Sequence, residues 1–181
     1  MPYGHPREVE ALDKLCCPVM SVDDKYRTLY AALMGVFKEI AEFARQADMP
    51  PDAVQGIVNA ALHGAGVSAG IRLKRVYQLE DTVEDAVKML VLFNNEAMAY
   101  LPKMKQIYGE IGKHEGMLIV KNDPWYDWYF KDLDIDCAQT CGTFEFPGLL
   151  SVLGPDLKVT VVRARPRGDD ICSFRITQGK S

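Results

Sequence analysis

The sequence predicts a single α+β domain, with helices in its first part and a small antiparallel sheet in its last part. Two patterns indicate this order: apolar residues recur at helical spacing in the first half, and they alternate with polar residues near the C-terminus. The chain has 181 residues, of which 48% are hydrophobic, which is enough for one core and too few for two. We assign residues 1–50 to an N-terminal helical extension and residues 51–181 to the α+β core.

A first helix is predicted over residues 22–47, behind Ser21 as a cap, and the prolines that follow end it. A second helix is predicted to begin near Pro51 and to run through the segment AVQGIVNAALHG. The apolar positions that recur at helical spacing in the first helix are Leu29, Leu33, Val36, Phe37, Ile40 and Phe43.

The next segment places Gly66 and Gly70 four residues apart, so that one helical face lacks side chains. Such a face suits either the close packing of two helices or the close approach of a ligand. His63 lies beside this face and is a candidate for a ligand pocket. A further helix is predicted over residues 81–101, because acidic residues open it and apolar residues dominate it.

The C-terminal part carries the strand patterns. Residues 117–121 predict a short strand, and residues 125–144 are expected to be helical in part. The stretch KVTVVRARPRGDDICSFRI alternates, turns and alternates again, which predicts a β-hairpin. In its second strand Cys172 and Phe174 fall on one face with Ile176, because side chains two residues apart point to the same side.

The charge of the chain argues against a nucleic-acid partner. Its formal net charge is −4, whereas phosphate binding needs a basic face. The densest basic cluster, Arg163, Arg165 and Arg167, lies in the predicted hairpin turn and is typical of a solvated tip.

The sequence also predicts a cytoplasmic protein without a membrane partner. No apolar run approaches the ~20 residues that span a bilayer. The N-terminal stretch MPYGHPREVE has no apolar segment behind a basic start, so it does not resemble a secretory signal. The five cysteines are then expected to stay reduced.

Cys137 and Cys141 lie four residues apart, so that a helix would place both thiols on one face. Together with Cys172 they would form a set of three thiolates suited to zinc or another soft metal, although CxxC is the commoner zinc spacing. One of these thiols would instead be reactive if a nearby cation lowered its pKa. A buried cysteine that fills core space is the third interpretation. We expect no cofactor, with zinc as the alternative.

The C-terminal part contains the segment PWYDW, a later cysteine and the stretch LGPDLKVTVVRARPRGDDICSF, and the helix HGAGVSAGIRLKR lies upstream of them. Together these features resemble the L-2-amino-thiazoline-4-carboxylic acid hydrolase-like family. The same outline is similar to the 4-vinyl-reductase domain, which binds hydrophobic or tetrapyrrole-like molecules. The resemblance implies the ligand-binding fold of haem–nitric-oxide and Golgi-trafficking domains, with residues 51–181 as the ligand-binding core.

Two positions depart from these family patterns. Members of the hydrolase-like family often carry Cys-Pro-Trp where this chain has DPW, beginning at Asp123. The 4-vinyl-reductase pattern often has a cysteine at the place of Ala164, so that Cys137 or Cys141 would have to supply a third thiol.

Two functional hypotheses follow. In the first, the protein is a hydrolase that opens a C–N or C–S bond of a small heterocycle. Cys141 would be the nucleophile, Asp123 the acid or base, and Cys137 an accompanying catalytic thiol. Arg163 or Arg165 would bind a substrate carboxylate through bidentate hydrogen bonds.

In the second hypothesis, the chain is a non-catalytic domain that binds a small hydrophobic, aromatic or tetrapyrrole-like molecule. The segment WYDWYF is aromatic on all sides, so some of its rings should line a pocket or a subunit interface, and we expect a homodimer. The residues expected around the ligand are His63, Gly66, Gly70, Trp125, Trp128, Tyr129, Phe144 and Phe146.

Overall fold

The computed structural model describes most of the chain from residue 46 onward and single positions between residues 28 and 44. Each described position from 28 to 46 is helical, in agreement with the helix predicted over 22–47. The predicted cap at Ser21 and the candidate residues Asp123 and Trp125 lie outside the described residues. The continuous described ranges are 46–98, 105–108, 111–112, 114–121, 126–131 and 136–179.

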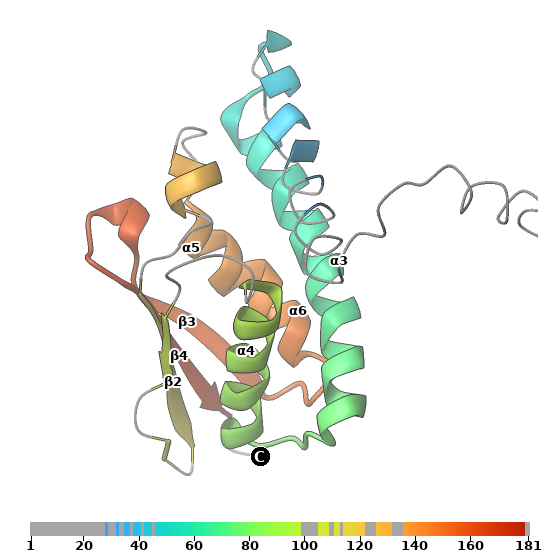
Figure 1. Cartoon of the computed structure of the whole chain (residues 1–181), viewed down its shortest axis with the longest axis vertical. Coiled ribbons are helices and arrows are strands. Elements are labelled where there is room, and N and C mark those ends of the chain that lie inside the picture. The colour runs from blue at the N-terminus through green and yellow to red at the C-terminus, as the bar shows by residue number, and fades with distance from the viewer. Residues whose placement is uncertain are drawn as a thin grey trace, which may run out of the picture.

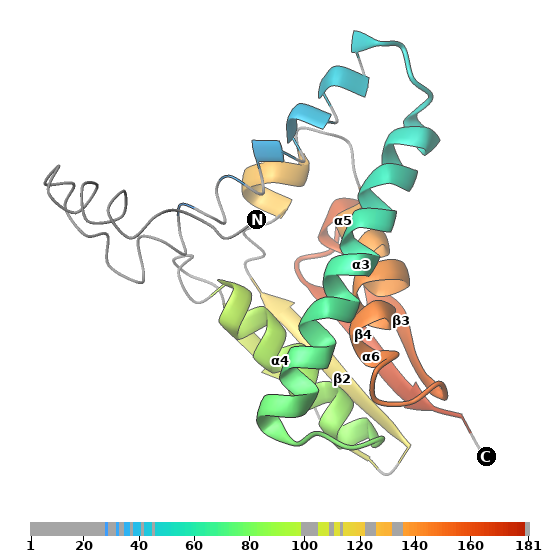
Figure 2. The same cartoon turned by 90° about the vertical axis from the view of Figure 1, so that its right-hand side faces the viewer.

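The described chain forms an α+β domain, as the sequence predicts, and its elements are arranged in three layers (Figures 1 and 2). An antiparallel sheet forms the first layer, helices α4 and α6 form the second, and the long helix α3 lies beside α6 in the third. The helices are α3 (Pro51–Tyr77), α4 (Val83–Met98), α5 (Cys137–Thr140) and α6 (Phe146–Leu150), with π-helical turns η1 (Tyr126–Phe130) and η3 (Cys141–Glu145) and the 3-10 turn η4 (Arg165–Arg167). The strands are β1 (Lys105–Tyr108), β2 (Glu115–Lys121), β3 (Leu157–Arg163) and β4 (Cys172–Gln178).

The sheet has four strands in the order β1-β2-β4-β3, and every neighbouring pair is antiparallel. The predicted hairpin is confirmed as β3 and β4, and its register places Val159 opposite Ile176. The predicted strand at 117–121 is confirmed and begins two residues earlier, at Glu115. Strand β1 was not predicted, because four residues are too few to establish an alternating pattern.

Helix α3 begins where the sequence predicts, with Pro51 in its first turn behind Pro50. A proline is well placed there because the first helical N–H groups have no partner inside the helix. The helix does not stop at the glycine-rich segment but continues through it, and its total length is 27 residues. It ends at Gln78, which adopts the left-handed conformation with φ 54° and closes the helix by donating its N–H to the carbonyl of Lys74.

Gly66 and Gly70 let α3 approach the segment from η3 to α6 at backbone distance. A Cβ atom at Gly66 would collide with the carbonyl of Glu145, and one at Gly70 would lie 2.5 Å from the carbonyl oxygen of Leu149. The face without side chains therefore contacts helix backbone, as in the first of its two interpretations, and leaves no room for a ligand there. This correction removes both glycines from the predicted ligand pocket.

The core lies between the sheet and the helices. Phe146 of α6 meets Phe174 of β4 edge to face, with ring centroids 4.8 Å apart and planes at 76°. Aromatic pairs favour this geometry over face-to-face stacking. Phe146 is therefore a core residue and not part of a ligand pocket, whereas Phe144 is half-buried.

Candidate functional site

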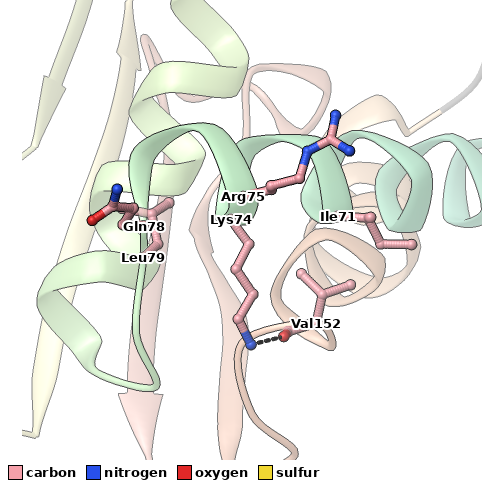
Figure 3. Close-up of a pocket in the computed structure, with 6 residues that line it drawn as sticks. All are labelled: Ile71, Lys74, Arg75, Gln78, Leu79 and Val152. Atoms are coloured by element: carbon pink, nitrogen blue, oxygen red, sulfur yellow. Dashed lines mark hydrogen bonds between the residues drawn. The ribbon is translucent and has the colours of Figure 1, made fainter.

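An open groove of about 570 Å³ lies where the C-terminal end of α3 meets the turn after α6 (Figure 3). Val152 contributes to it from that turn. Leu79, which is buried, and the exposed side chain of Ile71 supply its other apolar surface. The remaining lining residues are Lys74, Arg75 and Gln78.

The two walls of the groove are held together by one charged side chain. Lys74 reaches from α3 across to the turn and donates a hydrogen bond from its Nζ to the carbonyl oxygen of Val152 at 2.6 Å (Figure 3). Arg75 points away from Val152, from the rim of the groove, and its side chain is exposed. The groove therefore has an ammonium group at its wall and a guanidinium group at its edge.

These cations have no acidic partner in the part of the chain that the structure describes. Lys74, Arg75 and the neighbouring Arg72 take part in none of the ion pairs formed by the described residues. The ammonium of Lys74 contacts a neutral carbonyl instead. No described side chain within 4 Å therefore neutralises the positive charge at this end of α3.

The arginines chosen from the sequence for substrate binding are in a different situation. Arg165 donates two hydrogen bonds to Asp127, at 2.9 and 3.0 Å, and its guanidinium lies 5.2 Å from the centroid of the Tyr126 ring. Arg163 donates to Asp170 at 2.8 Å. The bidentate carboxylate expected for a substrate is thus provided to Arg165 by the chain itself, which corrects that expectation.

Arg167 completes this cluster at the hairpin tip. Its guanidinium donates to Asp136 at 2.8 Å and to the side-chain oxygen of Gln139 at 2.7 Å. Because Asp136 also caps α5 by accepting from the N–H of Gln139, the tip arginines fasten η1 and α5 to the hairpin. Their role in the described structure is to hold segments of the fold together.

The three candidate cysteines lie in different surroundings. Cys137 is buried, with 2% of its surface exposed, and Cys172 belongs to the core and accepts a hydrogen bond from the N–H of Arg165 at 3.4 Å. Cys141, at the junction of α5 and η3, is half-buried against the core. Among the described residues, no three side chains from His, Cys, Asp and Glu are grouped so that they could hold a metal ion, and all three cysteines are described.

His63 lies on α3 beside the close contact with η3. The carbonyl of Phe144 accepts a hydrogen bond from its Nδ1 at 3.0 Å, and the side chain is exposed. Two helical turns earlier, Gln55 donates to Thr140 at 2.6 Å. These contacts join α3 to α5 and η3, so His63 has a polar partner in the fold and does not line the groove.

None of the residues selected from the sequence lines the groove. Of the catalytic and ligand candidates, Asp123 and Trp125 lie outside the described residues, and only the backbone of Trp128 is described, within η1. The signal that could have identified the groove is the run IRLKRVYQL, from Ile71 to Leu79, which combines three cations with exposed apolar residues at a helix end.

Comparison with known proteins extends only to structures. No protein-family model matches the chain, and no curated protein sequence matches it, so membership of the hydrolase-like family remains a resemblance.

Within the described residues, no helix has the length and apolar character that crossing a membrane requires. The predicted homodimer and cytoplasmic location stay predictions.

Two solved structures with a similar fold were determined with bound ligands. A trafficking protein particle complex subunit 3 from Naegleria fowleri, solved covalently bound to palmitic acid, matches with a TM-score of 0.58 at 10% identity, over 85% of this chain and 97% of that one. The H-NOX domain from Shewanella oneidensis in the Fe(II)CO ligation state matches with a TM-score of 0.53 at 15% identity, over 81% and 75% of the two chains. At these identities the similarity establishes the fold, and the implied Golgi-trafficking and haem–nitric-oxide fold is confirmed.

Proposed function

We propose that this chain is a non-catalytic binding domain for a small organic molecule, which it holds in the groove between α3 and the turn after α6. The observation that carries the proposal is the composition of the groove. Ile71, Leu79 and Val152 offer an apolar surface, and a small number of polar groups stand beside it. Ligand sites combine these two elements, because apolar contact provides affinity and a few polar groups fix the orientation.

The size of the groove supports a small ligand. Its volume of about 570 Å³ falls within the range of roughly 300–1,000 Å³ that is typical of small-molecule sites. The exposure of Ile71 adds to the argument, since 58% of its surface faces water and would gain from being covered. A ligand of modest size could cover Ile71 and touch Val152 at once.

The fold gives further support. Related architectures hold ligands in other proteins: the Naegleria subunit was solved with covalently bound palmitic acid, and the Shewanella domain was solved in Fe(II)CO ligation states. The hydrolase hypothesis needs Asp123 beside Cys141, and no observation in the described residues favours that arrangement over simple binding.

The proposal is tested by a binding titration with two fluorophores that share an apolar body, neutral N-phenylnaphthylamine and anionic anilinonaphthalene sulfonate, and amide NMR shifts locate the bound molecule. We expect saturable binding, with the largest shifts at Ile71, Leu79 and Val152. Replacing Ile71 by Ser should weaken binding by about threefold to tenfold, because it removes much of the exposed apolar wall. The absence of shifts at these amides would rule the groove out as the site.

Two variants serve as controls. Val76 lies one turn further along α3 with 56% exposure, close to the 58% of Ile71, but it does not line the groove, so Val76→Ser should leave affinity unchanged. Equal losses for both variants would count against the groove. Cys141→Ser should also preserve affinity. If the native protein hydrolysed a bound compound and Cys141→Ser did not, that result would favour the hydrolase hypothesis instead.

A further inference from the structure

We infer that the ligand of this groove is an organic anion, an apolar body that carries a carboxylate, sulfonate or phosphate group. This inference rests on the proposed function and specifies the chemistry of its ligand. It follows from the position of the apolar wall next to positive charges that the described part of the fold leaves without counter-ions.

The first step concerns Lys74. Its ammonium has three N–H donors and carries a full charge. One donor is used by the carbonyl of Val152 at 2.6 Å, which satisfies a hydrogen bond but does not neutralise the charge. Two donors remain for a ligand oxygen beside Val152, on the groove wall. The bond to Val152 also holds the long side chain in place, so that less conformational entropy is lost when an anion binds.

The second step concerns the surrounding charge. Arg75 stands at the rim, and Arg72 is exposed on the same helix end, so that three cations lie within four residues of a chain whose net charge is −4. The negative end of the α3 dipole, worth about half an elementary charge, favours cations here but compensates only part of them. Glu80 and Asp81 follow the helix, and the carboxylate of Asp81 is turned to Gly154 and Gln178.

The third step joins charge and shape. Val152 both accepts the hydrogen bond from Lys74 and lines the apolar part of the groove, so the charged and apolar surfaces share a boundary. Ile71 and Leu79 continue the apolar surface from α3. A molecule whose anionic group meets Lys74 can therefore lay its apolar body across Ile71, Leu79 and Val152 without moving the backbone.

The experiment compares the same two fluorophores, which differ mainly by the sulfonate group. We expect anilinonaphthalene sulfonate to bind the native protein about five to ten times more tightly than neutral N-phenylnaphthylamine, in line with a partly exposed charge-assisted contact. This ratio should shrink as salt is added, because ions screen the attraction. Lys74→Met keeps the apolar stem and should lower the ratio to about two, the part that Arg75 still supplies, through weaker sulfonate binding alone.

Three further variants define the controls. Lys74→Arg preserves a cation and should retain most of the ratio. Arg75→Gln should lower it by about twofold, since the guanidinium acts from the rim. Arg72→Gln removes an equal charge from the same helix end at a residue that does not line the groove, and should lower the ratio by clearly less than Arg75→Gln does. Thermal unfolding of each variant checks that the domain remains folded.

The outcomes separate the inference from the proposed function. Equal affinity for both fluorophores, unchanged in Lys74→Met and with shifts at Ile71 and Val152, would overturn the anionic ligand and keep the binding groove. A preference for the sulfonate with amide shifts outside the groove would overturn the placement at Lys74. So would an Arg72→Gln variant that lowers the affinity ratio as much as Lys74→Met does. Failure of both fluorophores to shift the groove amides would overturn both statements.

Discussion

The hairpin tip and the C-terminal end of α3 each carry three cations, and the two regions use them differently. At the tip, Arg163, Arg165 and Arg167 each meet a carboxylate of the same chain. At the end of α3, Arg72, Lys74 and Arg75 make no ion pair with any described side chain. The numbers of charges are equal, but only one region neutralises them.

The difference shows how a structural cation can be told from one available to a ligand. A guanidinium that already donates two hydrogen bonds to one carboxylate has one edge of its N–H groups occupied, as Arg165 does with Asp127. A lysine bound to a carbonyl keeps both its charge and most of its donors, as Lys74 does with Val152. A basic cluster in a sequence therefore has to be assessed by the acids that the fold brings to it.

Substitution of Gly70, at the contact between the two walls of the groove, should cause the greatest loss of stability. In Gly70→Ala, the new Cβ would lie 2.5 Å from the Leu149 carbonyl and 3.0 Å from Val152, so we expect a loss of about 1–3 kcal/mol in the free energy of unfolding. Fluorophore affinity should fall as α3 and the turn move apart. Denaturant unfolding and the titration measure both.

The matched control is Gly64→Ala on the same helix. No atom lies within 4 Å of the position of its Cβ, so the substitution should stabilise the helix by about 0.5–1 kcal/mol. If both alanines stabilised the protein, the close contact between α3 and α6 would be wrong.

A second prediction tests the two kinds of cation directly. Arg165→Gln removes the bidentate pair with Asp127 and the contact with the Tyr126 ring, and should cost about 1–2 kcal/mol of stability while leaving groove affinity unchanged. Arg75→Gln should have the opposite profile, with stability within about 0.5 kcal/mol of the native protein and weaker sulfonate binding. Identical profiles in unfolding and titration experiments would remove the distinction.

Substitution of Gln78, at the C-terminal end of α3, should have a smaller effect, confined to stability. Gln78 holds a left-handed conformation with φ 54°, which strains any residue with a Cβ and suits glycine. Gln78→Gly should therefore raise stability by about 0.5–1 kcal/mol, as measured by thermal unfolding. The ratio of the two fluorophore affinities should not change, because both groove cations remain. A lower stability would show that the Gln78 side chain contributes more than its backbone strain costs.

Much of the fold could be predicted from local patterns. The alternation around RPRGDD predicted β3 and β4, and the proline at 51 predicted the start of α3, because both signals act between residues close in sequence. The spacing of Gly66 and Gly70 indicated close packing but could not name the partner, since the Glu145 and Leu149 carbonyls arrive from a distant segment.

The candidate site could not be predicted in the same way. The arginines of the hairpin tip stood out in the sequence as a cluster, and only the fold shows that Asp127, Asp136 and Asp170 occupy them. Lys74 and Arg75 are hard to single out in the sequence, because cations are common at helix C-termini, where the dipole favours them.

Local sequence patterns were sufficient to predict the class of this protein, an α+β domain of helices followed by a hairpin. Those properties depend on periodicity and composition, which act along the chain. Which charges are neutralised and where a groove remains depend on tertiary packing, because ion pairs, hydrogen bonds and cavities bring together residues far apart in the sequence, as with Lys74 and Val152, which are 78 positions apart. The positions of distant partners follow from how the layers pack, and no local pattern encodes them.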